Sequence, residues 1–139
     1  MIASCISNAV EVVIDTNGQL GTINSSRRFK NDIADMKDAS DGLMKLRPVT
    51  FHYKQGSADG VDRLEYGLIA EEVAAVYPDA VTYTPTGETE TIQYHKINAM
   101  MLNEMQKQER KIQEQTKELE GLRERLANLE QMLKQNNQQ

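Results

Sequence analysis

The chain has 139 residues, of which 39% are hydrophobic and 27% charged, and its formal net charge is −5. This length accommodates one modest domain with appendages. The negative charge argues against non-specific nucleic-acid binding, because a phosphate-binding surface needs clustered excess Lys and Arg. With no Trp and two Phe, a large aromatic core is not expected.

Cys5 is the single cysteine, so no disulfide can form within the chain and nothing indicates passage through an oxidising compartment. No apolar run reaches membrane-spanning length, and the first residues lack the regions of a signal peptide. We therefore expect no membrane partner. We also expect the start of the chain to be an internal boundary of a longer protein.

The first 24 residues have an extended, β-rich pattern. β-Branched residues dominate Val10 to Asp15, Thr16-Asn17-Gly18 is a turn signal, and residues 19–23 form a second short strand. A unit of two such strands cannot bury a core alone. It needs partners, either from the rest of the chain or from other chains.

The next segment contains the candidate chemistry. Ser25 and Ser26 are followed, at +5 and +4, by Lys30. A serine becomes a nucleophile only when a base removes its proton, and a lysine of lowered pKa can be that base. Because the reference lysine pKa is about 10.4, the site must lower it through burial and the positive charge of Arg27 or Arg28.

A purely structural explanation of the same residues is also available. Ser25 would cap a helix, Asp32 and Asp35 would be its first-turn acids, and Lys30 would be a solvated helix residue. On spacing alone this explanation is preferred, because serine–lysine pairs at this separation are common.

Residues 30–46 are predicted to be helical, with an apolar stripe on one face and Asp and Lys on the other. Gly42 is expected to interrupt this helix. Pro48 is expected to end it, because the residue before a proline disfavours the α region. The stripe, which we expect to be ordinary core, consists of Ile33, Met36, Leu43, Met44 and Leu46.

Two further hairpins and a helix are predicted downstream. Residues 49–54 and 63–67 read as strands joined by a polar loop. Residues 68–77 form an amphipathic helix that stops at Pro78. Residues 81–84 and 90–94 form a projecting hairpin, because Pro, Thr and Gly between them have turn chemistry.

From Asn98 onward the pattern changes to heptads that persist long enough to predict a coiled coil. Glu118 to Arg123 and Arg125 to Glu130 have the g-to-e spacing of interchain ion pairs, each worth little when exposed. Glutamines at d would need amide partners, which a ring of identical glutamines supplies in a symmetric bundle. The a series is Asn98, Met105, Ile112, Leu119, Leu126 and Leu133; the d series is Met101, Gln108, Gln115, Leu122, Leu129 and Asn136.

Two motifs together resemble the peptidase S74 family, the self-cleaving intramolecular chaperone domain at the C-terminus of phage tailspikes and tail fibres of the endosialidase type. The family motif Ser-(Asp)-x-Arg-x-Lys falls on Ser25, Arg28 and Lys30, with Ser26 where many members carry Asp. A second family segment, Gly-x-Ile-Ala-x-Glu-Val with a downstream Pro, matches residues 67–78. This second match and the predicted C-terminal coiled coil together reverse the preference for the structural explanation.

The resemblance implies an α+β fold in three parts. A β-rich stalk remnant (1–24) precedes a small chaperone and autoprotease domain of short helices with a projecting β-hairpin (25–97), and a trimeric coiled coil follows (98–139). Ser25 would attack the carbonyl of Asn24 and break the Asn24–Ser25 bond, with Lys30 as base and then acid. Arg28 and Ser26 would support the site.

The function that the resemblance implies is that of a single-turnover serine autopeptidase and chaperone, which trimerises and aligns an upstream β-stalk and then releases itself. Its partners would be identical chains and that stalk, without nucleic acid, membrane or cofactor. His52 and His95 lack the ligand spacing of a metal site, so no metal is expected. The domain would act in the host cytoplasm during virion assembly and be discarded, leaving the fibre in the virion.

Two alternatives remain open. In the first, the chain is a non-catalytic trimerisation or attachment module that stays joined to its fibre, and the serine and lysine are inert. In the second, the domain belongs to a cellular membrane-bound transcription factor. The second alternative is disfavoured because no DNA-binding or membrane segment is visible.

Overall fold

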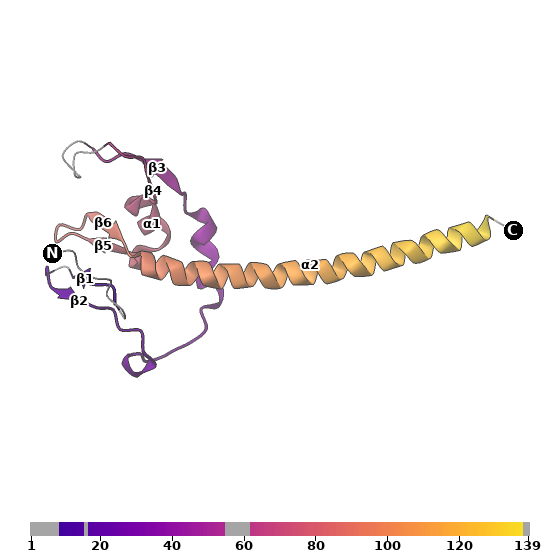
Figure 1. Ribbon diagram of the computed structural model, residues 1–139, viewed down its shortest axis with the longest axis horizontal. Coiled ribbons are helices and arrows are strands. Elements are labelled where there is room, and N and C mark those ends of the chain that lie inside the picture. The colour runs from indigo at the N-terminus through magenta and orange to yellow at the C-terminus, as the bar shows by residue number, and fades with distance from the viewer. Residues whose placement is uncertain (1–8, 16, 55–61, 138–139) are drawn as a thin grey trace.

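The computed structural model describes residues 9–15, 17–54 and 62–137; Cys5 and most of the loop predicted between the second pair of strands lie outside the described residues. A small domain of mixed helices and antiparallel strand pairs sits at one end of a long helix (Figure 1), which confirms the α+β class. The elements are β1 (Val13–Ile14), β2 (Leu20–Gly21), η1 (Arg27–Phe29), η2 (Lys37–Lys45), β3 (Val49–Phe51), β4 (Glu65–Gly67), α1 (Ala70–Val76), η3 (Pro78–Ala80), β5 (Val81–Tyr83), β6 (Thr89–Ile92) and α2 (Tyr94–Asn136), where η denotes a 3₁₀ helix.

The first hairpin forms where it was predicted, although its strands are shorter. Ile14 pairs with Leu20 in antiparallel register. The backbone N–H groups of Gln19 and Asn17 donate to the Asp15 carboxylate at 2.8 and 2.9 Å. These hydrogen bonds, that from Gln19 first, lower the pKa of Asp15. Gly18 has φ +78°, which glycine adopts without steric cost. The apolar side chains of this hairpin region remain exposed: Val10, Val12, Ile14 and Leu20.

The helix predicted for residues 30–46 is wrong over its first part and in its type. Residues 30–36 are not helical, and η2 is a 3₁₀ helix that begins only at Lys37. Asp32 and Lys37 have positive φ values of 51° and 46°, a left-handed conformation that costs an L-residue about 1–2 kcal/mol. The apolar stripe is also partly wrong, because Ile33 and Met44 are 53% and 68% exposed.

Gly42 does not interrupt this helix as predicted. It lies inside η2, where a Cβ atom would come within 2.8 Å of both Tyr77 Oη and Val76 Cγ1. The absence of a side chain at this position therefore lets η2 pack closely against the end of α1.

The core is small and lies where α1, η3, the β5–β6 hairpin and the start of α2 meet. Val73 of α1 and Ala80 of η3 are each 1% exposed, which confirms the predicted amphipathic helix. Leu43 and Leu46 add their side chains from η2 and the residue after it. The remaining buried members are Val81, Ile92 and Ile97.

The other two predicted hairpins are also confirmed. β3 pairs with β4, with Val49 opposite Gly67. β5 pairs with β6 around Thr84 to Glu88, where Gly87 has φ +86° and the Thr84 N–H donates to the Glu88 carbonyl at 2.8 Å. The β1–β2 and β5–β6 hairpins lie at the end of the molecule opposite the C-terminus (Figure 1).

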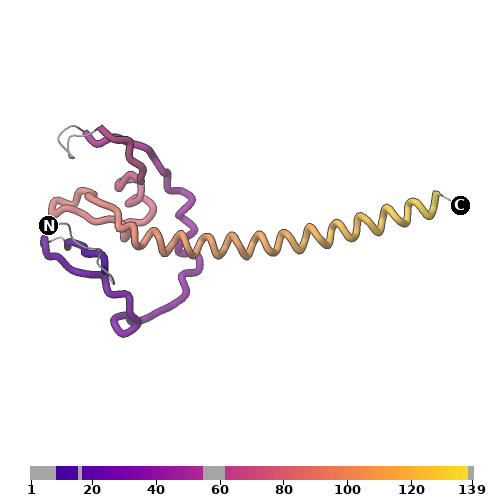
Figure 2. Tube along the Cα trace, viewed as in Figure 1, coloured from indigo at the N-terminus to yellow at the C-terminus, as the bar shows by residue number. Residues whose placement is uncertain are grey.

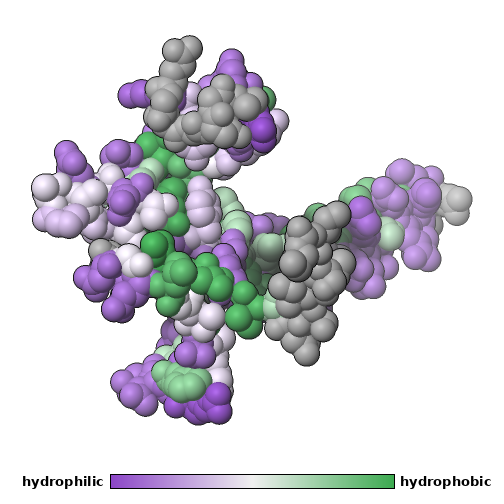
Figure 3. All heavy atoms as spheres, turned by 60° about the vertical axis from the view of Figure 1, so that its left-hand side comes forward, coloured by the Kyte–Doolittle hydropathy of each residue, from purple (hydrophilic) through white to green (hydrophobic). Residues whose placement is uncertain are grey.

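α2 runs without interruption for 43 residues, about 65 Å at 1.5 Å per residue (Figure 2). Its apolar seam is exposed in the single chain: Met105 is 65% exposed and Leu126 57%. Figure 3 shows a band of hydrophobic side chains between hydrophilic lobes on one face of the molecule. Apolar surface of this extent marks an interaction site, so the coiled coil remains a prediction that the helix is long enough to satisfy.

Two glycine substitutions test this packing as a matched pair. Gly42→Ala should lower the free energy of unfolding by about 1–3 kcal/mol, because the new methyl group collides with Tyr77 and Val76. Gly121→Ala, on α2 with no atom near its Cβ position, should raise it by about 0.5–1 kcal/mol. Denaturant unfolding at equal chain concentration measures both, and a neutral Gly42→Ala variant would refute the close contact.

Candidate functional site

The predicted site residues lie together on one segment between β2 and η2. Ser26 has φ −63° and ψ 141° and starts the short helix η1. The Phe29 N–H donates to the Ser26 carbonyl and the Lys30 N–H to the Arg27 carbonyl, both at 3.0 Å. A single 3₁₀ turn therefore separates Ser25 from Lys30.

This segment, residues 21–35, which we call the serine segment, is exposed in the single chain. Every residue from 21 to 35 is exposed, and the segment swings away from the core before it reaches η2 (Figure 2). The Arg28 guanidinium carbon lies 4.7 Å from the centre of the Phe29 ring, a cation–π contact. Among the hydrogen bonds of the described residues, none joins the Ser25 and Lys30 side chains. The single chain thus holds serine and lysine on one segment and buries neither.

The capping explanation of the serines is wrong. Ser26, not Ser25, occupies the N-cap position of η1, and its side chain makes no capping hydrogen bond. Asp32 has left-handed backbone geometry, and neither it nor Asp35 lies in the first turn of a helix. The local structure therefore leaves both hydroxyl groups without a helix-capping role.

A polar cluster that the sequence did not reveal fastens η2 to α2. The Ser40 side chain is fully buried, and its Oγ donates to Glu104 Oε2 at 2.9 Å. Asn103 Nδ2 donates to the same Oγ at 2.7 Å and to the Lys37 carbonyl at 2.8 Å. We call this cluster the η2–α2 clamp; its members are Ser40, Asp41, Asn103, Glu104 and Lys107.

Lys107 completes the clamp by binding two carboxylates, Glu104 Oε2 at 3.0 Å and Asp41 Oδ1. The hydrogen bonds to Asp41 and Glu104 raise the pKa of Lys107. Those from Lys107 and Ser40 lower the pKa of Glu104. The cluster escaped prediction because Asn103, Glu104 and Lys107 occupy the f, g and c positions, where polar residues are typical of any amphipathic helix.

The second sequence motif has structural roles. Gly67 lies against two rings, since a Cβ there would be 3.1 Å from Tyr94 Oη and 3.3 Å from Phe51 Cε1. Glu72 accepts two hydrogen bonds from the Arg47 guanidinium, one of them from Nε at 3.2 Å, and so ties α1 to the end of η2. Val73 is the centre of the core. The motif therefore builds the scaffold that carries the serine segment.

Across residues 9–15, 17–54 and 62–137, no three His, Cys, Asp or Glu side chains gather into a group that could hold a metal ion. Within the same part of the chain, no helix combines the length and apolar character needed to cross a membrane.

The segment that carries Ser25 and Lys30 matches a known protein family. Residues 25–82 match the sequence model of the peptidase S74 family, described as chaperone of endosialidase. The resemblance to this family is confirmed. The matched range, which we call the S74 segment, begins at Ser25, contains both motifs and ends in β5.

A curated relative supports the same assignment. The chain is 36% identical over 69 residues to the "Long tail fiber protein Gp37" of Escherichia phage AR1. The alignment covers 48% of this chain and 6% of the phage protein. The aligned half of the chain thus spans only a small part of that fibre protein.

The clamp predicts how stability depends on pH. The pKa of Glu104 is depressed from 4.5, so its contribution is present above that value and is lost as pH falls through the folded-state pKa. The pKa of Lys107 is raised from 10.5, so its contribution is present below that value and is lost as pH rises through the folded-state pKa. Lys107→Met should therefore lower the free energy of unfolding near neutral pH. It should also make that free energy depend less on pH on both the acid and the alkaline side.

Denaturant midpoints measured across the acid and alkaline limbs test this prediction. Lys111→Met is the matched control, because Lys111 is an exposed lysine of the same helix. A Lys107→Met profile parallel to that of the wild type would show that the clamp does not couple protonation to folding.

Proposed function

We propose that this chain is a tail-fibre chaperone domain that aligns three copies of an upstream β-stalk and then releases itself by cleaving the Asn24–Ser25 bond. The observation that carries the proposal is the S74 match, which begins at Ser25 and includes Arg28 and Lys30 in the family spacing. The phage fibre relative supports the biological setting. The site of action would be the host cytoplasm during virion assembly.

The two faces of α2 support assembly into a bundle. In its first turns, the residues at c, f and g contact the chain's own domain: Ile97 and Met100 pack on the core, and Asn103 enters the clamp. Residues at a and d, such as Met101 and Met105, remain exposed. From Met105 onward the seam is therefore left exposed for three parallel helices, while the small domain packs beside the first turns of α2.

The exposed first hairpin supports the stalk role. Two short strands with outward apolar side chains cannot be stable alone, so neighbouring chains of a fibre would cover them. Intertwined strands fold slowly, because their contacts are far apart in sequence or between chains. A C-terminal bundle raises the effective concentration of the three stalk ends and sets their alignment.

The proposed reaction is an acyl transfer followed by hydrolysis. Neutral Lys30 takes the proton of Ser25 Oγ while Oγ bonds to the carbonyl carbon of Asn24. The carbon–nitrogen bond between Asn24 and Ser25 then breaks, and the lysine returns the proton to the departing amine. Water hydrolyses the resulting ester, which leaves a carboxylate on Asn24 and a free amine and hydroxyl on Ser25.

Assembly would switch this chemistry on. A lysine acts as a base near neutral pH only when its surroundings disfavour the charged form, and removal from water does this. In the single chain the serine segment is exposed, and it carries two apolar side chains, Phe29 and Ile33, at 56% and 53% exposure. A neighbouring chain that covers these side chains would also exclude water from Lys30.

Cleavage would make the finished fibre kinetically stable. Once the chaperone has left, the stalk can no longer unfold by reversing the path on which it assembled, and its persistence is governed by a rate rather than by an equilibrium.

The rival function is an uncleaved attachment module. The observation that favours it is the exposure of both Ser25 and Lys30 in the single chain. Both functions share the trimer and differ only in the covalent fate of the Asn24–Ser25 bond.

Serine variants separate these functions. Ser25→Ala should abolish cleavage, because it removes the attacking oxygen, whereas the matched control Ser26→Ala should still cleave. Lys30→Ala should also stay whole. Intact-mass measurement under denaturing conditions shows directly whether each chain has been cleaved. A wild-type chain that stays whole while it sediments as a trimer would leave only the attachment function.

A seam variant tests whether cleavage depends on assembly. Leu119→Asp places three carboxylates in the a layer of the bundle, where burying unpaired charge costs several kcal/mol. It should weaken the trimer and slow cleavage by about tenfold or more, as a loss of at least 1.4 kcal/mol implies. Lys117→Asp, on the outer face of the same turn, should change neither the sedimentation nor the mass. Full-rate cleavage in a monomeric Leu119→Asp chain would show that one chain suffices.

A further inference from the structure

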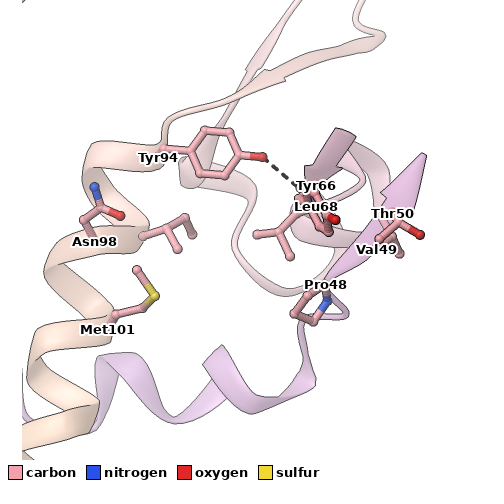
Figure 4. A pocket seen from close by; sticks show the side chains of 10 residues that line it. Pro48, Val49, Thr50, Tyr66, Leu68, Tyr94, Asn98 and Met101 are labelled. Atoms are coloured by element: carbon pink, nitrogen blue, oxygen red, sulfur yellow. Dashed lines mark hydrogen bonds between the residues drawn. The ribbon is translucent and has the colours of Figure 1, made fainter. Parts of the chain in front are cut away.

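An open groove of about 570 Å³ lies between the β3–β4 pair and the first turns of α2. Figure 4 shows Pro48 and Tyr66 on the strand side and Met101 on the helix side, with the Tyr94 ring reaching from α2 towards Leu68. None of its lining residues is charged. The groove therefore suits an apolar side chain.

The Tyr94 side of the groove is preformed. The Leu68 N–H donates to Tyr94 Oη at 3.3 Å, the dashed line in Figure 4, which fixes the ring across the gap. Gly67 leaves room for that ring, since a Cβ there would come within 3.1 Å of the same oxygen. The wall next to it is Ile97, which is 4% exposed.

The groove continues the heptad seam. With Asn98 at a, Tyr94 and Met101 occupy d positions, and all three line the groove. A second helix that packs along the seam in a parallel bundle must therefore pass the groove mouth. The groove is the place where the seam of α2 meets the β3–β4 pair.

Heptad geometry identifies the side chain that arrives there. In parallel helices, a residue at g faces the e residue five positions later on the neighbouring chain. Ile97 is at g, and five positions later comes Leu102 at e, which is 57% exposed in the single chain. Later in α2, the g residue Glu118 faces the e residue Arg123 of the neighbouring chain, which pairs opposite charges. The first pair is instead apolar on both sides, as the uncharged groove requires.

We propose that Leu102 of a second copy of this chain fills the groove, so that the β3–β4 pair becomes part of the interface between chains. This inference rests on the parallel bundle of the proposed function. It adds a register lock: a slip of one heptad would bring His95 or Glu109, the neighbouring e residues, to the apolar groove in place of Leu102. A chaperone that aligns stalk ends needs such discrimination, because the last heptads carry leucine at most a and d positions and can pack after a slip of one heptad.

The absence of Trp from the chain gives a clean test. Tyr66→Trp puts a fluorophore in the groove wall, at a position 76% exposed in the single chain. Tyr53→Trp is the control, because Tyr53 follows β3, is 59% exposed and does not line the groove. Both are made in the full chain with Ser25→Ala, and acrylamide quenching is measured beside sedimentation.

The expected result is a trimer in which Trp at 66 is quenched about threefold less than Trp at 53, as shielding by a neighbouring chain predicts. Adding Leu102→Ala should return quenching at 66 to the control level while the later heptads keep the trimer together. Adding Gln106→Ala, at an exposed b position, should leave the shielding unchanged.

The other outcomes each overturn the inference in a distinct way. A trimer in which Trp at 66 is quenched like the control leaves the groove empty, and the assembly part of the proposed function stands. Shielding that survives Leu102→Ala assigns the groove to another segment, such as the upstream hairpin. If the chain is monomeric at every concentration, no bundle forms. The assembly part of the proposed function is then refuted together with the Leu102 contact.

Discussion

The buried hydroxyl of Ser40 joins the two parts of this molecule. It donates to Glu104 and accepts from Asn103, and Lys107 binds the two nearby carboxylates of Asp41 and Glu104. Asn103 and Lys107 lie at the outer positions f and c, and Glu104 lies beside them at g, so η2 is fixed away from the a and d positions of the proposed bundle. The apolar seam on the opposite side stays free. This polar cluster, together with the packing of Ile97 and Met100 on the core, thus sets which face of α2 the chain's own domain covers.

The same contact sets the position of the serine segment. Asn103 holds the Lys37 carbonyl, at the point where the chain leaves its extended path and enters η2. Residues 21–35 before it are exposed, and they include the apolar side chains of Phe29 and Ile33. The segment is therefore tethered near α2 but left uncovered. In the proposed mechanism this keeps the lysine hydrated and the serine inactive until neighbouring chains arrive.

Much of the fold was predictable because its signals are local. The three hairpins follow from turn residues, with Gly18 and Gly87 at the positive φ values their turns require. α1 follows from the spacing of its apolar residues around Val73, and α2 from its heptads. The failure at residues 30–36 arose because Ile33 fits a helical stripe by spacing, although the described part of the chain leaves it 53% exposed. Periodicity records which residues are apolar and not whether a surface exists to bury them.

For the candidate site, the sequence by itself determined the residue types, their order and their spacing: Ser25, Arg28 and Lys30 are recognisable without coordinates. It also determined the heptads of α2, since both features are properties of neighbours along the chain. Only the tertiary structure decided that Gly42 serves close packing, that Asn103 and Glu104 bind Ser40 across more than sixty residues of sequence, and that the groove opens onto the seam. These are contacts between segments distant in sequence. Their energies depend on burial and hydrogen-bond geometry, which no local pattern encodes.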